Sequence, residues 1–426
     1  MKKAESSTPV KSSQIECVLD FCVDLSRRMI VSGANLERVK LAVERICHAY
    51  KLHDISISLL STYISLAARD AEGRYASRQG SIPAAGIQLE QLKNLNRLSY
   101  YVVENHPAPS RLNTLLEEVM VVKDYSDWVV LLAQICAMSC LCLIFGGGFR
   151  EVLCVLLITA EMHGLLRLMA RPGLDRTVTN AITMWAATAT AILLMAAGVS
   201  ADGTVILITV SMLVIPGIPL VNAVRNLLCG NEMNGILQLL KVTIETLSLA
   251  MGIYLSILMF GRGYATGGEI KTSLTDPILL ILLSFLASTG FGVVFRIPRH
   301  DLWRAGLGGA LTRIALILTN TWLSSRMACV TIAALFASLY AELLATKRKD
   351  PSTYFVYPAI IPLIPGDLFY YAIEGLYAGD WQMFRTNGQS CLLTLFAMSI
   401  GFVISSIIAH YVRKMRHRRL VNPPST

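Results

Sequence analysis

The sequence predicts an all-α polytopic membrane protein, with about ten transmembrane helices in two inverted-topology five-helix repeats behind a small α+β soluble N-terminal domain. Three observations predict this fold class. Of the 426 residues, 54% are hydrophobic and only 16% are charged, which is too apolar for an ordinary soluble protein. Apolar runs of spanning length follow one another from Trp128 onward. A Pro-Gly motif recurs inside two of these runs.

The N-terminal domain, residues 1–125, shows both helical and strand periodicity. Apolar residues recur at helical spacing in four segments, and the Ser32–Asn35 sequence separates the first two. Between the helical segments, two short runs show strand character, the first through a two-residue alternation. The predicted helices cover residues 17–30, 36–50, 88–104 and 110–122, and the predicted strands cover residues 55–59 and 63–68. We therefore expect a small sheet packed against helices.

Ten apolar runs follow this domain, separated by short polar or Gly/Pro-bearing links. They fall into two modules of five, residues 126–262 and 275–413. The predicted spans are residues 127–145, 151–170, 178–198, 204–222, 236–260, 276–295, 302–320, 327–346, 353–373 and 388–412.

The orientation of the spans follows from the distribution of Lys and Arg, which concentrate in cytoplasmic links. With the N-terminus inside, the inside links and the C-terminal tail carry fifteen of these cations, and the outside links carry five: Arg150, Arg262, Lys271, Arg326 and Arg385. Residues 1–11 are polar and basic, and no apolar signal segment follows them. We expect a multi-pass protein of the bacterial cytoplasmic (inner) membrane, with both termini and the N-terminal domain in the cytosol.

An internal repeat is the most informative feature of the sequence. Ile215-Pro216-Gly217 recurs as Ile364-Pro365-Gly366, and the same offset of 149 residues relates Gly230 to Gly379 and Gly252 to Gly401. Five spans separate the two copies, so the copies enter the membrane from opposite sides. Inverted-topology repeats of this kind are typical of secondary transporters that work by alternating access.

Each Pro-Gly pair predicts a broken transmembrane helix, because proline removes a backbone donor and clashes with the preceding turn. Backbone left unpaired in a membrane survives only against protein or a water-filled cavity. The ends of such half-helices suit a zwitterion, since exposed amides attract a carboxylate and carbonyls attract an ammonium group. The predicted substrate-binding residues are Pro216, Gly217, Asn222, Arg225, Asn226, Pro365, Gly366, Asp367 and Tyr370.

Ionisable residues inside the spans are candidates for coupling transport to protons. Asp367 directly follows the second break, and it is the leading candidate; Glu161 and Glu245 are the others. Glu161 and Arg313 lie near the middles of spans that correspond in the two repeats, so a salt bridge between them is a further hypothesis. His163 could titrate near neutral pH or serve as a packing hydrogen-bond donor. Glu342, near the predicted cytoplasmic face, is assigned no role.

Five stretches of the sequence resemble the threonine/serine exporter family, and together they run over nearly the whole chain. They are Ser32–Val39, Leu89–Leu98, Phe145–Gly147, Val214–Gly230 and Ile360–Gly379. The resemblance implies a cytosolic leader fused to two five-helix modules. It also implies export of threonine or serine driven by the proton motive force. Split members of the family are linked to dicarboxylates, so a succinate-like substrate is the alternative.

A membrane-anchored hydrolase or sensor that acts through the N-terminal domain is the competing hypothesis. It would need a nucleophile such as Ser32, Ser61 or Cys47, but no GxSxG, HExxH or P-loop sequence accompanies these residues. An anchor also has no need of two Pro-Gly breaks. The candidate bases are His48, His53 and His106, and the candidate acids are Asp54 and Asp70.

The remaining composition points to few other partners. The net charge of +9 arises from short clusters between apolar runs, which excludes a nucleic-acid surface. The ten cysteines show no ligand spacing, so neither a metal nor a cofactor is expected. We expect the partners to be a small amino-acid or dicarboxylate substrate, protons and the lipid bilayer. Small residues in 186–189 and 306–310 permit close helix approach within the repeats or in a homo-oligomer.

Overall fold

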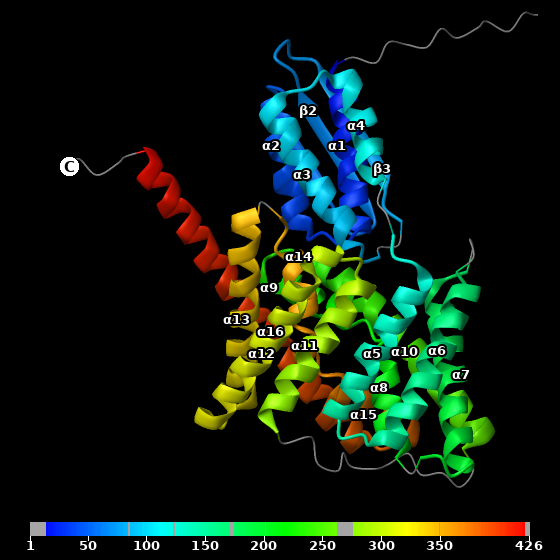
Figure 1. Ribbon diagram of the computed structural model, residues 1–426. Helices are drawn as coiled ribbons and strands as arrows, with labels where there is room; N and C mark the ends of the chain where they lie inside the picture. The colour runs from blue at the N-terminus through cyan, green and yellow to red at the C-terminus, as the bar shows by residue number, and fades with distance from the viewer. Residues whose placement is uncertain are drawn as a thin grey trace, which may run out of the picture. The chain divides into compact units, whose positions relative to one another are not determined.

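The computed structural model describes residues 14–83, 86–121, 124–170, 174–200, 202–261, 276–348 and 350–421 (Figure 1). The chain forms two compact units. The leader unit comprises Met1–Lys123 together with Lys349–Pro351, and the membrane unit comprises Asp124–Arg348 and Ser352–Thr426. The polar segment at residues 1–11 lies outside the described residues.

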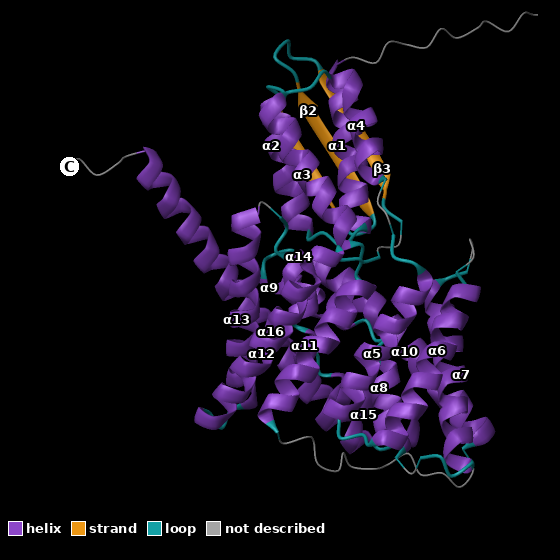
Figure 2. Ribbon diagram, in the orientation of Figure 1, coloured by secondary structure: helices purple, strands orange, loops and turns teal. Residues whose placement is uncertain are grey.

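The leader unit is an α+β domain with one three-stranded antiparallel sheet, coloured orange in Figure 2. The strand order is β1-β2-β3, and β2 pairs with both neighbours. The elements are α1 (Gln14–Val31), α2 (Leu36–Ala49), β1 (His53–Leu59), β2 (Tyr63–Arg69), β3 (Tyr75–Ser81), α3 (Leu89–Asn105), a 3₁₀ turn (Pro109–Arg111) and α4 (Leu112–Met120). The four predicted helices and the two predicted strands are confirmed within a few residues.

The core of the leader lies between α1 and one face of the sheet. Ile64, Leu66 and Ala68 alternate along β2 and are completely buried, as the two-residue period of a half-covered strand requires. Phe21 and Leu25 of α1 are buried as well. The separation of the first two helices also has a clear cause. Asn35 accepts a hydrogen bond from the Glu37 amide at 3.0 Å and so caps the start of α2.

Strand β3 was not predicted from the sequence. Its residues, Tyr75–Ser81, are mostly small and polar and include Gly80; they contain no β-branched side chain, and Tyr75 is their one aromatic residue. The strand is held by backbone pairing to β2, from Tyr63↔Ser81 to Arg69↔Tyr75. Gly80 lies where a Cβ atom would approach Val23 of α1 to 2.9 Å. Backbone pairing and close packing thus form a strand where side-chain preference does not.

The membrane unit is entirely helical in its described residues. Its helices are α5 (Asp127–Ile144), α6 (Phe149–Leu168), α7 (Arg176–Ala196), α8 (Gly203–Ser211), α9 (Gly217–Leu228), α10 (Glu232–Phe260), α11 (Pro277–Val294), α12 (Leu302–Trp322), α13 (Arg326–Arg348), α14 (Thr353–Ala359), α15 (Gly366–Ala378) and α16 (Trp381–Val421), with 3₁₀ turns at Arg299–Asp301 and Ile361–Leu363. Each of the ten predicted spans falls on one of these helices or on a broken pair, α8–α9 or α14–α15.

Six helices of the described chain are long and apolar enough to cross a membrane: α5, α7, α10, α11, α13 and the Trp381–Ala409 part of α16. The other four predicted spans differ for two reasons. Helices α6 and α12 are long enough, but they carry charged side chains that include Glu161 and Arg313. The pairs α8–α9 and α14–α15 are divided at Pro216 and Pro365 into shorter helices. The protein is therefore a multi-pass membrane protein, whose ten-span arrangement we take up as a proposal below.

The two Pro-Gly breaks have the same backbone conformation. Pro216 adopts φ −77° and ψ 55°, and Pro365 adopts φ −78° and ψ 64°. At each break the glycine amide donates to the carbonyl two residues earlier at 2.8 Å, from Gly217 to Ile215 and from Gly366 to Ile364. The predicted breaks are confirmed as local structure, and the sequence repeat is also a repeat of geometry.

The glycines at the 149-residue offset also occupy matching positions. A Cβ atom on Gly252 of α10 would overlap the Ala181 carbonyl oxygen of α7. A Cβ atom on Gly401 of α16 would lie 2.6 Å from the Thr331 carbonyl oxygen of α13. Only glycine allows two helix backbones to approach so closely. A glycine therefore allows the same kind of close backbone approach in the pair α7–α10 and in the pair α13–α16.

Candidate functional site

The two broken helices meet within the membrane unit. Gly217 of the first break lies against Ile364, where an added Cβ would be 2.8 Å from Cγ2. Gly366 of the second break lies against Met212, where an added Cβ would overlap the sulfur atom. In the membrane unit, α9 and α14 lie toward one end of the bundle, and α8 and α15 lie toward the other (Figure 1). The breaks thus place two half-helices from different modules at each end.

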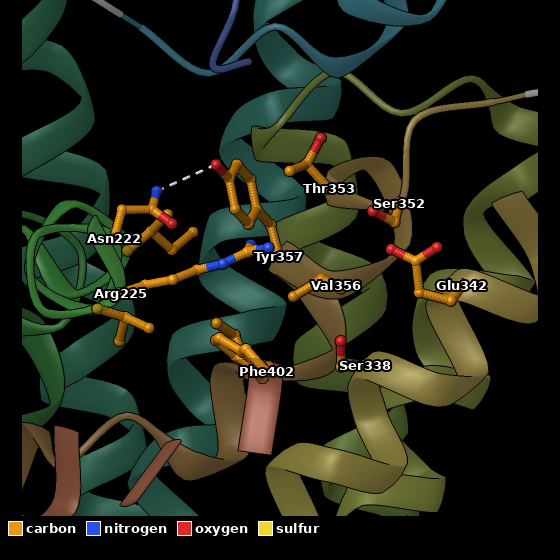
Figure 3. Close-up of a pocket in the computed structure, with 12 residues that line it drawn as sticks. Asn222, Arg225, Ser338, Glu342, Ser352, Thr353, Val356, Tyr357 and Phe402 are labelled. Carbon is orange, nitrogen blue, oxygen red and sulfur yellow. Dashed lines mark hydrogen bonds between the residues drawn. The ribbon is translucent and has the colours of Figure 1, made fainter. Parts of the chain in front are cut away.

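A narrow pocket lies between the half-helices α9 and α14 (Figure 3). Helices α13 and α16 complete its walls. The space between its side chains, including its open mouth, is about 380 Å³, and nearly all of it is too narrow for a water molecule. The lining residues are Ile218, Val221, Asn222, Arg225, Ser338, Glu342, Ser352, Thr353, Val356, Tyr357, Ile360 and Phe402. The pocket is tight in this conformation, so a bound amino acid requires it to widen.

A hydrogen bond joins α9 to α14 across this pocket. Asn222 of α9 donates from Nδ2 to the Tyr357 hydroxyl of α14 at 3.1 Å, drawn as the dashed line in Figure 3. Arg225, one turn further along α9, donates from Nη2 to Ser406 Oγ of α16 at 3.2 Å. Both predicted residues therefore lie in the pocket, and the structure adds Tyr357 as their partner in the other module.

The pocket contains one cationic and one anionic side chain. In Figure 3, Arg225 extends from α9 toward Tyr357, and Glu342 lies on α13 at the opposite side of the view. Both side chains are half-buried. Thr353 Oγ1 is buried and has no hydrogen-bond partner within the described part of the chain. A buried hydroxyl without a partner is costly, so a polar ligand at this position would stabilise it.

The other predicted binding residues lie outside this pocket. Asn226 donates from Nδ2 to Gln238 Oε1 of α10 at 3.1 Å, within the first module. Tyr370 is buried in α15, with its ring centroid 5.9 Å from that of Tyr371. Asp367 lies at the start of α15, where its Oδ2 is 4.0 Å from Arg326 Nη2. The structure thus brings together Asn222 and Arg225, and it places Asp367 in a separate contact.

The charged groups of the pocket are side chains rather than half-helix ends. The glycines of the breaks, Gly217 and Gly366, lie against the apolar side chains of Ile364 and Met212, and the prolines before them precede the first residue of each half-helix. Asn222 and Arg225 follow the first break by one and two turns. The breaks therefore act by orienting α9 and α14, and the side chains on these helices form the site.

The remaining intramembrane ionisable residues lie apart from the pocket. Arg313 of α12 donates from Nε to Ser284 Oγ of α11 at 3.0 Å, and no ion pair joins it to Glu161 in the described structure. The hypothesis of a Glu161–Arg313 bridge is therefore wrong in this conformation. His163 Nδ1 lies 2.7 Å from Gln134 Oε1, which links α6 to α5. Glu161 and Glu245 are half-buried on α6 and α10.

Comparison with known families accounts for most of the chain. A family model described as "Putative threonine/serine exporter" matches residues 20–260, and a second, described as "Threonine/Serine exporter, ThrE", matches residues 280–408. The chain belongs to the threonine/serine exporter family. It is therefore a membrane transporter of the exporter type, in agreement with the resemblance in its sequence.

Three curated relatives support this membership. A protein named "Probable threonine/serine exporter" from Mycobacterium tuberculosis is 22% identical over 434 residues, covering 97% of this chain and 80% of the relative. A protein named "Probable succinate transporter subunit YjjP" from Escherichia coli is 20% identical over 60% of this chain and its own full length. The protein of the same name from Klebsiella aerogenes is 20% identical over 59% of this chain and 98% of itself. No solved structure matches the chain.

Members of this exporter family are transporters, and the leader unit shows no assembled catalytic group in its described residues. Ser32 donates to Gln91 Oε1 at 3.0 Å, and Asp70 accepts from Arg74 Nε at 2.6 Å. Cys47 is completely buried against Cys22, and the hydrogen bond between them, together with burial, raises the pKa of the Cys22 thiol. The described residues contain no group of three or more His, Cys, Asp and Glu side chains that could hold a metal.

The sequence analysis did not predict the residues of α13 and α14 that line this pocket. Glu342 was set aside as a residue near the cytoplasmic face, yet it lines the pocket with Ser338, which is four residues earlier on α13. An i, i+4 pair lies on one helix face, and a polar pair in an apolar helix is a detectable signal. Tyr357 directly precedes Pro358 inside α14, where its hydroxyl could be placed only by the tertiary fold.

Proposed function

We propose that this chain is a secondary transporter that exports threonine and serine from the cytosol, driven by the proton motive force. The observation that carries the proposal is the pocket between α9 and α14, with Arg225 and Glu342 among its lining residues. The guanidinium of Arg225 binds the substrate carboxylate, and the carboxylate of Glu342 binds its ammonium group. Hydroxyl groups of Thr353 and Tyr357 lie beside them for the hydroxyl of threonine or serine.

The charges of the pocket favour a zwitterion over a dicarboxylate. A succinate-like substrate carries two negative charges, and Glu342 would repel one of them in a site that contains a single Arg and no Lys. An α-amino acid presents one charge of each sign. The names of two relatives refer to succinate, which makes dicarboxylate export the second candidate function. We place dicarboxylate export second because the Glu342 carboxylate lines this pocket.

The same proposal includes two inverted five-helix modules, residues 126–262 and 275–413, in the bacterial cytoplasmic membrane. The distribution of Lys and Arg supports a cytosolic location for both termini, and with that orientation α9 and α14 lie on the cytosolic side of the breaks. The pocket is then the site at which substrate binds from the cytosol. The equivalent half-helices α8 and α15 form the outward-facing counterpart, and rocking of one module against the other exposes each side in turn.

Proton coupling is assigned to Asp367, with Glu161 and Glu245 as further carboxylates within the spans. The observation that favours Asp367 is its position at the second break and its contact with Arg326. Protonation of Asp367 would remove the negative charge that attracts Arg326. Proton binding from the outside can therefore break this contact between α15 and α13. We assign this step to the return of the empty transporter to the conformation that faces the cytosol.

The experiment is an export assay on cells preloaded with labelled threonine, serine or succinate. Wild type and Asp367→Asn are compared with and without a protonophore, and the amount of protein in the membrane is measured for each. We expect cells with the wild-type protein to release threonine and serine, but not succinate, faster than cells without it. The protonophore should reduce this release to the level of cells without the protein. Asp367→Asn is expected to lose the dependence on the protonophore. Protonophore-sensitive release of succinate alone would establish the second candidate function instead.

A further inference from the structure

Glu374 of α15 occupies the position in its half-helix that Arg225 occupies in α9. Each residue lies eight positions after the glycine of its Pro-Gly break and five positions before a second glycine, so the offset of 149 residues also relates Arg225 to Glu374. The glycines are Gly217 and Gly230 in the first copy and Gly366 and Gly379 in the second; φ is 79° at Gly230 and 73° at Gly379. The two half-helices thus match at both ends, and Glu374 is the counterpart of a residue that lines the pocket.

Glu374 is buried inside the membrane unit. It is 4% exposed, whereas Arg225 is half-buried. Among the acidic residues that the structure describes in this unit, Asp301 is the only other buried one, and it forms ion pairs with Arg304 and Arg348. A carboxylate in the membrane interior is costly while it is charged, so such residues generally mark pathways for ions or protons. The burial of Glu374 therefore indicates a function rather than a role in packing.

Two tyrosines share the face of α15 that carries Glu374. Tyr370 is four residues before Glu374 and Tyr377 is three residues after it, and these spacings put all three on one side of a helix. Tyr370 is 1% exposed, and its hydroxyl interacts electrostatically with both Glu374 and Tyr377. A tyrosine hydroxyl both donates and accepts hydrogen bonds, so it suits a carboxylate as well as a carboxylic acid. This environment can hold Glu374 with or without a proton.

The helices that pack against α15 are α8, α10 and α16. The titratable groups that they or the link before α16 bring near α15 are Tyr254 of α10, then Cys391, Arg385 and Asp380. The ring centroids of Tyr254 and Tyr377 are 6.4 Å apart, and Cys391 lies near Asp367. Arg385 and Asp380 are exposed, and α8 has no titratable side chain. Of the described carboxyl groups at these contacts, Glu374 is therefore the buried one.

The two half-helices differ in charge. Asp367 lies on the same face of α15 as Glu374, two turns or about 10 Å earlier along the helix. Helix α9 carries Arg225 and has no acidic residue between Gly217 and Leu228. In the proposed function, the cation on α9 binds the substrate carboxylate. The two carboxylates on α15 are then left for the coupling ion.

We propose that Glu374 is a second proton-binding residue of the transport cycle, alongside Asp367. A proton needs no more room than the carboxylate oxygen that it joins, whereas a substrate ammonium group would need a cavity beside a side chain that is almost completely buried. The proton comes from water on one side of the membrane and forms an O–H bond with the carboxylate. It leaves to water on the other side after α15 has moved. Protonation removes the charge of a buried group, so it makes movement of α15 within the membrane less costly.

The proposal rests on the proposed function for the transport step, but proton binding by Glu374 can be measured without transport. Infrared difference spectroscopy on the purified full-length protein follows the C=O band of carboxylic acids as the pH is lowered. In wild type, we expect a band from a carboxylic acid shielded from water, separate from that of the exposed carboxyl groups. Glu374→Gln should lose this band. Glu232→Gln, which changes an exposed glutamate at the start of α10, is the matched control and should keep it.

The spectra decide whether Glu374 takes up a proton. Identical difference spectra of wild type and Glu374→Gln overturn the proposal, since a group that stays in one protonation state cannot carry a proton. The melting temperature of each variant is measured in parallel. If Glu374→Gln does not fold, Glu374→Asp decides the question, because it keeps a carboxyl group on a shorter side chain. The shielded band should then shift, and an unmoved band overturns the proposal.

Transport by proteoliposomes separates proton coupling from a structural role. Exchange of labelled threonine for unlabelled threonine requires no proton gradient, whereas net transport against a threonine gradient does. Glu374→Gln should keep the exchange and lose the gradient-driven transport, and Glu232→Gln should keep both. Equal loss of the two activities in Glu374→Gln would show that Glu374 only positions α15, which overturns the proposal. Failure of wild type to transport threonine in either assay would refute the proposed function and leave the infrared result valid.

Discussion

Replacing Arg225 with Gln is expected to weaken threonine binding by at least about thirtyfold, because loss of one partner from a buried charge pair costs about 2–5 kcal/mol. The substitution removes the one cation that lines the pocket and leaves the Glu342 carboxylate and the neutral hydroxyls in place. Labelled threonine binding to the purified protein measures the effect. The hydrogen bond from Arg225 to Ser406 is lost as well, so the melting temperature of the variant is measured in parallel.

The matched control for Arg225 is Lys241→Gln. Lys241 is an exposed cation on α10 that does not line the pocket. Threonine binding within about twofold of wild type is expected for it, since exposed charges contribute little. Equal weakening by the two substitutions would show that Arg225 acts through the overall positive charge of the protein. The assignment of the substrate carboxylate to Arg225 would then be wrong.

Alanine at Gly252 or Gly401 is expected to destabilise the membrane unit by about 1–3 kcal/mol, the usual cost of forcing a methyl group into a packed interior. The added Cβ would overlap the Ala181 carbonyl oxygen in the first case, and it would lie 2.6 Å from the Thr331 carbonyl oxygen in the second. A backbone atom cannot turn away as a flexible side chain can. The helix pairs α7–α10 and α13–α16 must therefore separate, and the melting temperature in detergent should fall in both variants.

Gly164 of α6 is the control for these two glycines. A Cβ atom there would meet nothing within 4 Å. Alanine in a helix interior is preferred over glycine by about 0.5–1 kcal/mol, so Gly164→Ala should leave the melting temperature unchanged or raise it. If Gly252→Ala lowers the melting temperature and Gly401→Ala does not, the two modules do not depend on equivalent helix contacts, and the proposed inverted repeat loses its main structural support.

Much of this architecture could be predicted because it is encoded by periodicity and by proline. The apolar runs identify the helices of the membrane unit, and Pro216 and Pro365 identify where two of them break, because proline cannot continue the hydrogen-bonding pattern. The leader helices follow from the same 3.6-residue period. Strand β3 could not be predicted, since its pairing with β2 is a property of the backbone and its side chains give no signal.

The site was harder to predict than the fold. Asn222 and Arg225 could be found because they follow a break on the same helix face. Tyr357 and Glu342 belong to helices more than a hundred residues away, and only the packing of one module on the other brings them to α9. The ion pair between Lys93 and Asp350 could not be predicted either. Only the structure shows that both side chains are buried and that they lie 3.6 Å apart.

Calorimetric titration of the purified wild-type protein and of Glu342→Gln with threonine and with succinate is the sharpest test of the proposed pocket. A pocket that binds a zwitterion should bind threonine and give no measurable heat with succinate. Removal of the Glu342 carboxylate should weaken threonine binding by about tenfold or more, the effect of one lost charge-assisted hydrogen bond of about 1.5–3 kcal/mol. Tighter binding of succinate than of threonine to wild type, with threonine binding unaffected by Glu342→Gln, would contradict the assignment of this pocket to an amino acid.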